Sequence, residues 1–97
     1  MSLLESIRVE AHPGEPDVFT VYHYTWPQAS PAPLIKRAVF RIGRSPNLNL
    51  VSTGVKLNHG PWVATTPRNP LDGDMIRVAK KQAQLVTGIR WWRVMIR

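Results

Sequence analysis

Hydrophobic and polar residues alternate near the start of the chain, which is the pattern of a half-buried β-strand. Residues 6–12 show this alternation, and residues 17–25 are rich in the β-branched and aromatic side chains that favour strands. Between them, residues 13–16 read Pro-Gly-Glu-Pro, a sequence typical of a turn. We therefore predict a β-hairpin. A short starting helix is the alternative, because Ser2 and Glu5 have the spacing of a helix capping box.

The middle of the chain returns to the same period-two pattern after a proline-rich segment. Three prolines in residues 26–33 predict an extended loop or arm, because proline cannot donate a hydrogen bond to a sheet. Residues 34–43, 48–57 and 62–66 follow as three predicted strands. Within the second of these strands, Gly54 is expected to mark a β-bulge or a bend.

Residues 72–88 have a helical period instead. Hydrophobic residues recur at spacings of three and four, at Ile76, Ala79, Ala83 and Val86. Asp72 or Asp74 can cap the start of a helix, and Gly88 can close its end in the left-handed conformation. We predict one helix here. The alternative is a hairpin that turns at residues 80–82, whose Lys-Lys-Gln sequence is a poor turn former.

The last nine residues, 89–97, combine two adjacent tryptophans with three arginines. As a strand, this segment has two faces, one with Trp92, Val94 and Ile96 and the other with Trp91, Arg93, Met95 and Arg97. As a helix, it would instead form a basic stripe of Arg90, Arg93 and Arg97. The upstream Gly88 and the aromatic and branched content of the segment favour the strand.

These segments together predict an α+β fold. A small antiparallel sheet of five or six strands is expected to carry one amphipathic helix, near residues 74–87, on one face. If residues 75–89 formed strands instead, the fold would be a small all-β barrel. The 97 residues are expected to form a single domain, with an acidic hairpin at 5–25, a proline-rich loop at 26–33 and a basic portion at 34–97.

Charge is distributed unevenly along the chain. Residues 1–33 carry one arginine against four carboxylates, a net charge of −3, whereas residues 34–97 carry twelve lysines and arginines against two aspartates, a net charge of +10. This asymmetry predicts a one-sided positive field, which favours a polyanion or an acidic protein surface as partner. The absence of cysteine excludes disulfides and thiolate chemistry.

The sequence lacks the usual membrane signals. The first residues do not contain the apolar run of a signal peptide, and no stretch approaches the roughly eighteen uncharged apolar residues of a spanning helix. We therefore expect a soluble, cytoplasmic protein that does not bind membranes.

The three histidines do not form a catalytic or metal-binding motif. In the predicted hairpin His12 lies near Asp17, whereas His23 lies roughly 20 Å further along the strand, too far away to share a metal or a proton with it. His59 could meet an aspartate further along the chain only through the tertiary fold. We expect a protein without enzymatic activity, metal or cofactor.

Arginines on the predicted strand faces are the first candidate binding site. Arg37 and Arg41 alternate outward on one strand, while Arg93 and Arg97 do so on another, beside Trp91. If the two strands are neighbours, these groups share one surface, where guanidinium groups can pair with phosphate oxygens and the indole can stack on an unpaired base. The alternative is that they only form the solvated face of a sheet. The neighbouring Arg90 belongs to the same basic set.

Two further sets of candidate residues are visible. The predicted helix carries a second positive cluster, made of Arg77, Lys80 and Lys81, which suits phosphate contacts or is simply a solvated face. An aromatic patch for a protein partner is formed by Tyr22, Tyr24 and Trp26. In the alternative interpretation, the tyrosines line the rim of a core made of Phe19, Phe40 and Trp62.

Together, these features predict a small basic binding protein that is not an enzyme. Its expected ligand is nucleic acid, either single-stranded or contacted through its backbone, with low sequence specificity. The alternative is a protein-interaction module, such as an assembly or inhibitor subunit or an accessory protein of a phage or mobile element. Such a module would dock on an acidic or larger protein or on an identical copy, forming a homo-oligomer.

Overall fold

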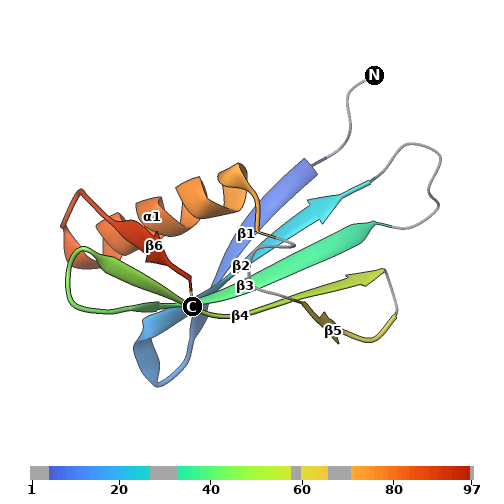
Figure 1. Ribbon diagram of the computed structural model, residues 1–97, viewed down its shortest axis with the longest axis horizontal. Helices are drawn as coiled ribbons and strands as arrows, with labels where there is room; N and C mark the ends of the chain where they lie inside the picture. Colours follow the sequence, from blue (N-terminus) through green and yellow to red (C-terminus); the bar gives the residue numbers. More distant parts are fainter. Residues whose placement is uncertain (1–4, 27–32, 58–59, 66–70, 97) are drawn as a thin grey trace.

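The computed structural model describes residues 5–26, 33–57, 60–65 and 71–96, which form a twisted sheet with a helix across one face (Figure 1). The elements in chain order are β1 (Glu5–His12), β2 (Glu15–Thr25), β3 (Leu34–Ile42), β4 (Asn47–Leu57), β5 (Val63–Ala64), α1 (Gly73–Thr87) and β6 (Arg93–Met95). The predicted α+β fold is therefore confirmed, and the sheet does not close into the alternative barrel. In the described residues, no helix is long and apolar enough to cross a membrane.

The strands form one predominantly antiparallel sheet. Strands β1 to β5 follow one another in chain order, each antiparallel to the next. The last strand, β6, instead lies parallel to the start of β4, beside Asn47–Asn49. Thus β5 and β6 share the outer edge of β4, with β5 beside Gly54 and Val55.

The core lies between the sheet and α1. Met75, Ala79 and Ala83 recur every four residues along α1 and are fully buried. The small alanines let the helix approach the sheet closely, where it packs over a layer formed by Phe19, Val21, Ala38, Phe40, Leu48 and Trp92. The rings of Phe19 and Phe40 stack with their centroids 5.6 Å apart. Burial of these apolar surfaces stabilises the two-layer arrangement.

The ends of α1 confirm the predicted caps. The Asp72 carboxylate accepts a hydrogen bond of 2.9 Å from the Met75 N–H, which satisfies one of the free donors of the first turn. Gly88 has φ of 77°, and its N–H donates to the Gln84 carbonyl. The alternative hairpin through residues 80–82 is therefore wrong, because these residues lie inside the helix.

Other local predictions need correction. Gly54 is not a bulge: it pairs in register with Arg37, whereas the extra residue in β4 is Val51, because Val39 pairs with Ser52 and the following Phe40 with Leu50. Of the strand expected over residues 62–66, the described part forms a strand at Val63–Ala64, and residue 66 lies outside the described residues.

At the chain ends, the predicted strands are also modified. Glu5 begins a strand and not a helix, while Ser2 lies outside the described residues. Within the described residues 89–96, only Arg93–Met95 form a strand, although the expected alternation holds: Trp92 is buried and Trp91 is 64% exposed. Most of the proline-rich loop, residues 27–32, lies outside the described residues.

Candidate functional site: the helix-free face of the sheet

The face of the sheet opposite α1 carries a row of large polar and aromatic residues. Side chains alternate between the two faces of a strand, so the neighbours of buried core residues point to this side. The strand register aligns Arg8 with Tyr22, Tyr22 with Arg37 and Arg37 with Gly54. The row therefore crosses β1 to β4 at a right angle to the strands.

Cations and aromatic rings alternate along this row. The Arg8 guanidinium carbon lies 5.0 Å from the centroid of the Tyr22 ring, and that ring lies 6.2 Å from the ring of Trp62. The Arg37 guanidinium carbon lies 4.1 Å from the Trp62 centroid. These distances are within the range in which the ring quadrupole attracts a cation.

Two more side chains widen the row. Tyr24 lies 6.4 Å from Tyr22, ring to ring, and its centroid is 5.9 Å from the Arg8 guanidinium carbon. The ammonium of Lys56 lies 5.0 Å from the Trp62 ring. We refer to the whole set as the cation–aromatic cluster, which consists of Arg8, Tyr22, Tyr24, Arg37, Lys56 and Trp62.

Gly54 gives Trp62 room to lie across β4. A Cβ atom at position 54 would lie 3.6 Å from Cε3 of the Trp62 ring and 3.4 Å from Nη2 of Arg37. It would also lie 3.3 Å from the Val63 carbonyl oxygen, closer than most side-chain contacts. The absence of a side chain at Gly54 therefore allows the indole from the β5 segment to reach the row.

The cluster is positive, while the hairpin end of the same face is neutralised. Among the described residues, no carboxylate pairs with Arg37 or Lys56, and Arg8 has only an exposed contact of 3.5 Å with Glu10. Arg41 is different, because it lies 3.6 Å from Glu15 and 3.7 Å from Asp17. Arg37, Lys56 and Arg93 thus have no carboxylate partner among the described residues of this face, and the first two contact Trp62.

The predicted arginines are only partly brought together. Arg37, Arg41 and Arg93 share the helix-free side, since Arg41 pairs with Asn49 and Arg93 with Asn47 on that side of β4. The strands β3 and β6 are not neighbours, however, because β4 lies between them. Arg93 donates to the Asn47 side chain at 3.1 Å.

The other predicted basic residues lie elsewhere. Arg90 and Trp91 are exposed in the segment between α1 and β6, and Arg97 lies outside the described residues. Arg77, Lys80 and Lys81 are exposed on α1, on the opposite side of the sheet from the cluster. Arg77 is paired with Asp74 at 2.9 Å. The helix cations Arg77, Lys80 and Lys81 therefore do not share a face of the sheet with Arg37.

The predicted aromatic patch is rearranged. Tyr22 and Tyr24 belong to the cluster, while Trp26, 38% exposed, follows the end of β2. The alternative interpretation placed Trp62 in the core, but its ring lies on the opposite face, beside Tyr22 and Arg37. Arg8 and Lys56 were not predicted as site residues. The hairpin alternation carried a signal for Arg8, which falls on the same face as the tyrosines, but no local pattern places Trp62 beside them.

Histidine and aspartate meet on the other face of the sheet, in a combination that the sequence did not reveal. His23 is buried in β2, and its Nδ1 lies 2.8 Å from Oδ2 of Asp72. Lys36 donates to the same oxygen at 3.2 Å. Partial burial raises the pKa of the Asp72 carboxyl, but hydrogen bonds from the Met75 N–H, His23 and Lys36 outweigh it and hold that pKa below its usual value.

The contacts of His12 differ from those expected. His12 contacts Thr20 at 2.6 Å and Glu15 at 3.9 Å, in place of the expected Asp17, because the register shifts at the end of β1. In the described part of the chain, no group of three or more histidine, aspartate or glutamate side chains could hold a metal.

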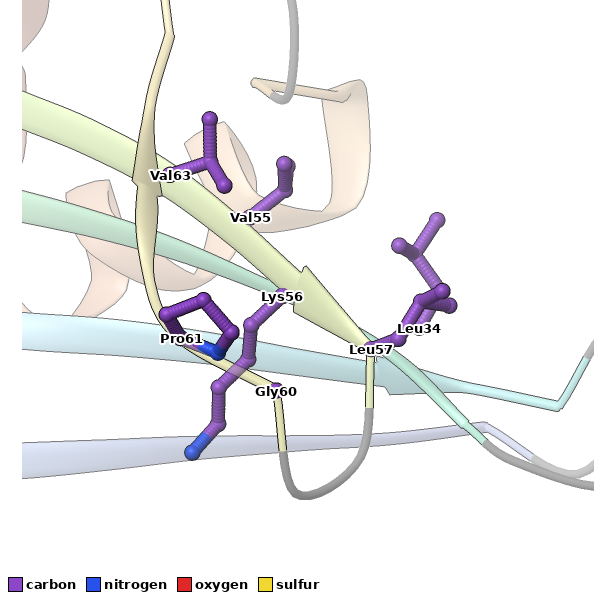
Figure 2. Close-up of a pocket in the computed structure, with 7 residues that line it drawn as sticks. All are labelled: Leu34, Val55, Lys56, Leu57, Gly60, Pro61 and Val63. Atoms are coloured by element: carbon purple, nitrogen blue, oxygen red, sulfur yellow. The ribbon is translucent and has the colours of Figure 1, made fainter.

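A separate apolar hollow of about 280 Å³ lies where β3, β4 and β5 meet. Figure 2 shows the side chains of Val55 and Val63 pointing to one side of the sheet, while Lys56 points to the other. The hollow is lined by Leu34, Val55, Lys56, Leu57, Gly60, Pro61 and Val63. Among the described residues that line the hollow, Lys56 is the only titratable group.

No protein-family profile, curated protein or solved structure matches this chain.

Proposed function

We propose that the protein binds single-stranded nucleic acid, with low sequence specificity, through the cation–aromatic cluster. The observation that carries this proposal is the alternation of cations and rings across four neighbouring strands, from Arg8 through Tyr22 and Arg37 to Trp62. Each nucleotide of a single strand carries one anionic phosphate and one flat base, which are the partners of a cation and a ring.

Each part of the cluster has a role in such binding. Tyr22, Tyr24 and Trp62 offer aromatic faces on which unpaired bases stack, while Arg37 and Lys56 pair with phosphates. Strand spacing gives the row from β1 to β4 a length of about 14 Å. Stacking uses the flat face that every base has, which agrees with binding that tolerates any sequence.

Salt dependence tests this proposal directly. A fluorescent single-stranded oligonucleotide is titrated with the protein at two or more salt concentrations. If Arg37 and Lys56 each release one counterion, the slope of log affinity against log salt is about −1.4. An absence of binding at low salt overturns the proposal.

Paired substitutions then locate the site. Trp62→Ala is expected to weaken binding by roughly tenfold, because loss of stacking costs about 1–3 kcal/mol per base. Trp91→Ala is the matched control: this indole is exposed but lies beside the start of β4, about 20 Å from Gly54 along that strand. If Trp91→Ala is the more damaging change, the ligand lies on another surface. Thermal melting of both variants shows that they remain folded.

A second candidate function is docking on a protein partner. It is favoured by four large apolar side chains within seven consecutive residues, namely Leu85, Val86, Ile89 and Trp91, which are between 42% and 71% exposed. Exposed apolar residues at such density are typical of interaction surfaces. If this second function holds, Trp91→Ala abolishes crosslinking of the protein to its protein partner, whereas Trp62→Ala leaves the crosslinking unchanged.

A further inference from the structure

Strand β1 has an open edge. It pairs with β2 on one side, and no described element pairs with its other side. The strand is eight residues long and contains no proline. Its outward N–H and C=O groups therefore form an unpaired row, which can accept another strand.

The sequence of β1 is complementary to itself in one register. Only every second residue of an edge strand points its N–H and C=O groups away from the sheet. In a symmetric antiparallel pair, the two-fold axis must therefore pass beside a residue that lies opposite its own copy, and the pair is said to be centred on that residue. Centring on Arg8 would place two arginines opposite each other, and centring on Glu10 would oppose two glutamates. Centring on Val9 places Arg8 of each chain opposite Glu10 of the other, twice.

The same register matches the remaining positions. Val9 meets its own copy and Ile7 meets Ala11, all on the side of the sheet that carries α1. On the other side, Ser6 meets His12. Arg8 and Glu10 already contact each other within one chain at 3.5 Å, but both side chains are more than half exposed and available for a partner across the edge.

We propose that two copies of this chain form a symmetric dimer through β1, antiparallel and centred on Val9. The charge complementarity of Arg8 and Glu10 identifies the second copy as the occupant of this edge. The resulting interface is isologous, so it closes at two chains.

The dimer has a consequence for ligand binding, which rests on the proposed function. The two-fold axis stands perpendicular to the sheet, so both helix-free faces point to the same side. The two cation–aromatic clusters then form one surface, with the Arg8 ends closest to the axis. A longer single strand can contact both clusters at once, and its affinity is expected to rise with length.

Molar mass in solution, measured without nucleic acid, tests the dimer itself. Light scattering coupled to size exclusion, over a range of protein concentrations, is expected to show a mass approaching twice the 11.0 kDa of one chain. A mass of one chain at every concentration up to the millimolar range overturns the proposal. The dimer and the proposed function fail independently. A monomer can still bind nucleic acid, and the mass measured without nucleic acid does not depend on whether oligonucleotides bind.

Charge reversal identifies the surface. Arg8→Glu or Glu10→Arg alone places like charges opposite each other twice, and the dissociation constant is expected to rise roughly tenfold or more. A mixture of the two single variants is expected to form a heterodimer, and the double variant Arg8→Glu with Glu10→Arg regains the dimer. A dimer whose mass is insensitive to all these changes uses another surface and contradicts the proposal.

Discussion

Nδ1 of His23, in the second strand, lies 2.8 Å from Oδ2 of Asp72, the residue that caps the helix, although 49 positions separate the two in the sequence. The same carboxylate also accepts from Lys36 and from the Met75 N–H. A single side chain thus starts the helix and fixes its first turn against β2 and β3.

This arrangement predicts that Asp72→Ala is strongly destabilising. The substitution removes the helix cap and leaves His23 and Lys36 without their carboxylate, with an expected loss of about 2–3 kcal/mol in the free energy of unfolding. Asp74→Ala is the matched control, because the ion-pair partner of Asp74 among the described residues is the exposed Arg77, and loss of this pair should cost less than about 1 kcal/mol. Urea unfolding measures both, and equal losses would contradict a special role for Asp72.

The lowered pKa of Asp72 predicts a dependence of stability on pH. A carboxyl whose pKa is lower in the folded than in the unfolded chain stabilises the fold when it is ionised. The contribution of Asp72 is therefore complete at neutral pH, begins to decline as the pH approaches its ordinary pKa of 3.8 from above, and disappears as the pH falls through the lower folded value.

Asp72→Asn isolates this effect, because the amide keeps a cap acceptor but cannot ionise. The difference in the free energy of unfolding between the natural chain and Asp72→Asn should shrink as the pH falls below about 4, and other carboxylates cancel in the comparison. A difference that stays constant from pH 7 to pH 2 would show that the charge of Asp72 has no part in stability.

Gly54→Val tests whether Trp62 needs the bare backbone of β4. Valine favours strands, but its branched side chain would displace the Trp62 ring and the Arg37 guanidinium, with an expected cost of about 1–3 kcal/mol. Ser52→Val, an exposed position on the same strand, is the control and should be nearly neutral. Near-ultraviolet circular dichroism and tryptophan fluorescence report the indole environment, which should change only for Gly54→Val.

Phe40→Ala tests the core between sheet and helix. Phe40 is fully buried and stacks on Phe19, so its truncation is expected to cost about 3–5 kcal/mol. Val51→Ala, at the bulge on the same sheet, is the control: Val51 is 55% exposed and should contribute less than about 1 kcal/mol. Thermal or urea unfolding measures the difference, and similar losses would mean that the core lies elsewhere.

Local patterns in the sequence determined the secondary structure and the direction of most side chains. The period-two alternation around Phe40 and the four-residue spacing of Ala79 and Ala83 each depend only on neighbouring residues. The same holds for the caps at Asp72 and Gly88, because a helix end is closed by groups within one turn. The α+β fold followed from these signals.

The tertiary structure alone decided which elements meet. The parallel pairing of β6 with β4 separates Arg93 from Arg37, and the approach of Trp62 over Gly54 brings this indole to the face with the tyrosines. His23 reaches Asp72 for the same reason. Such contacts join residues far apart in the chain, and their free energy comes from packing and charge pairing that exist only once the sheet and helix have assembled.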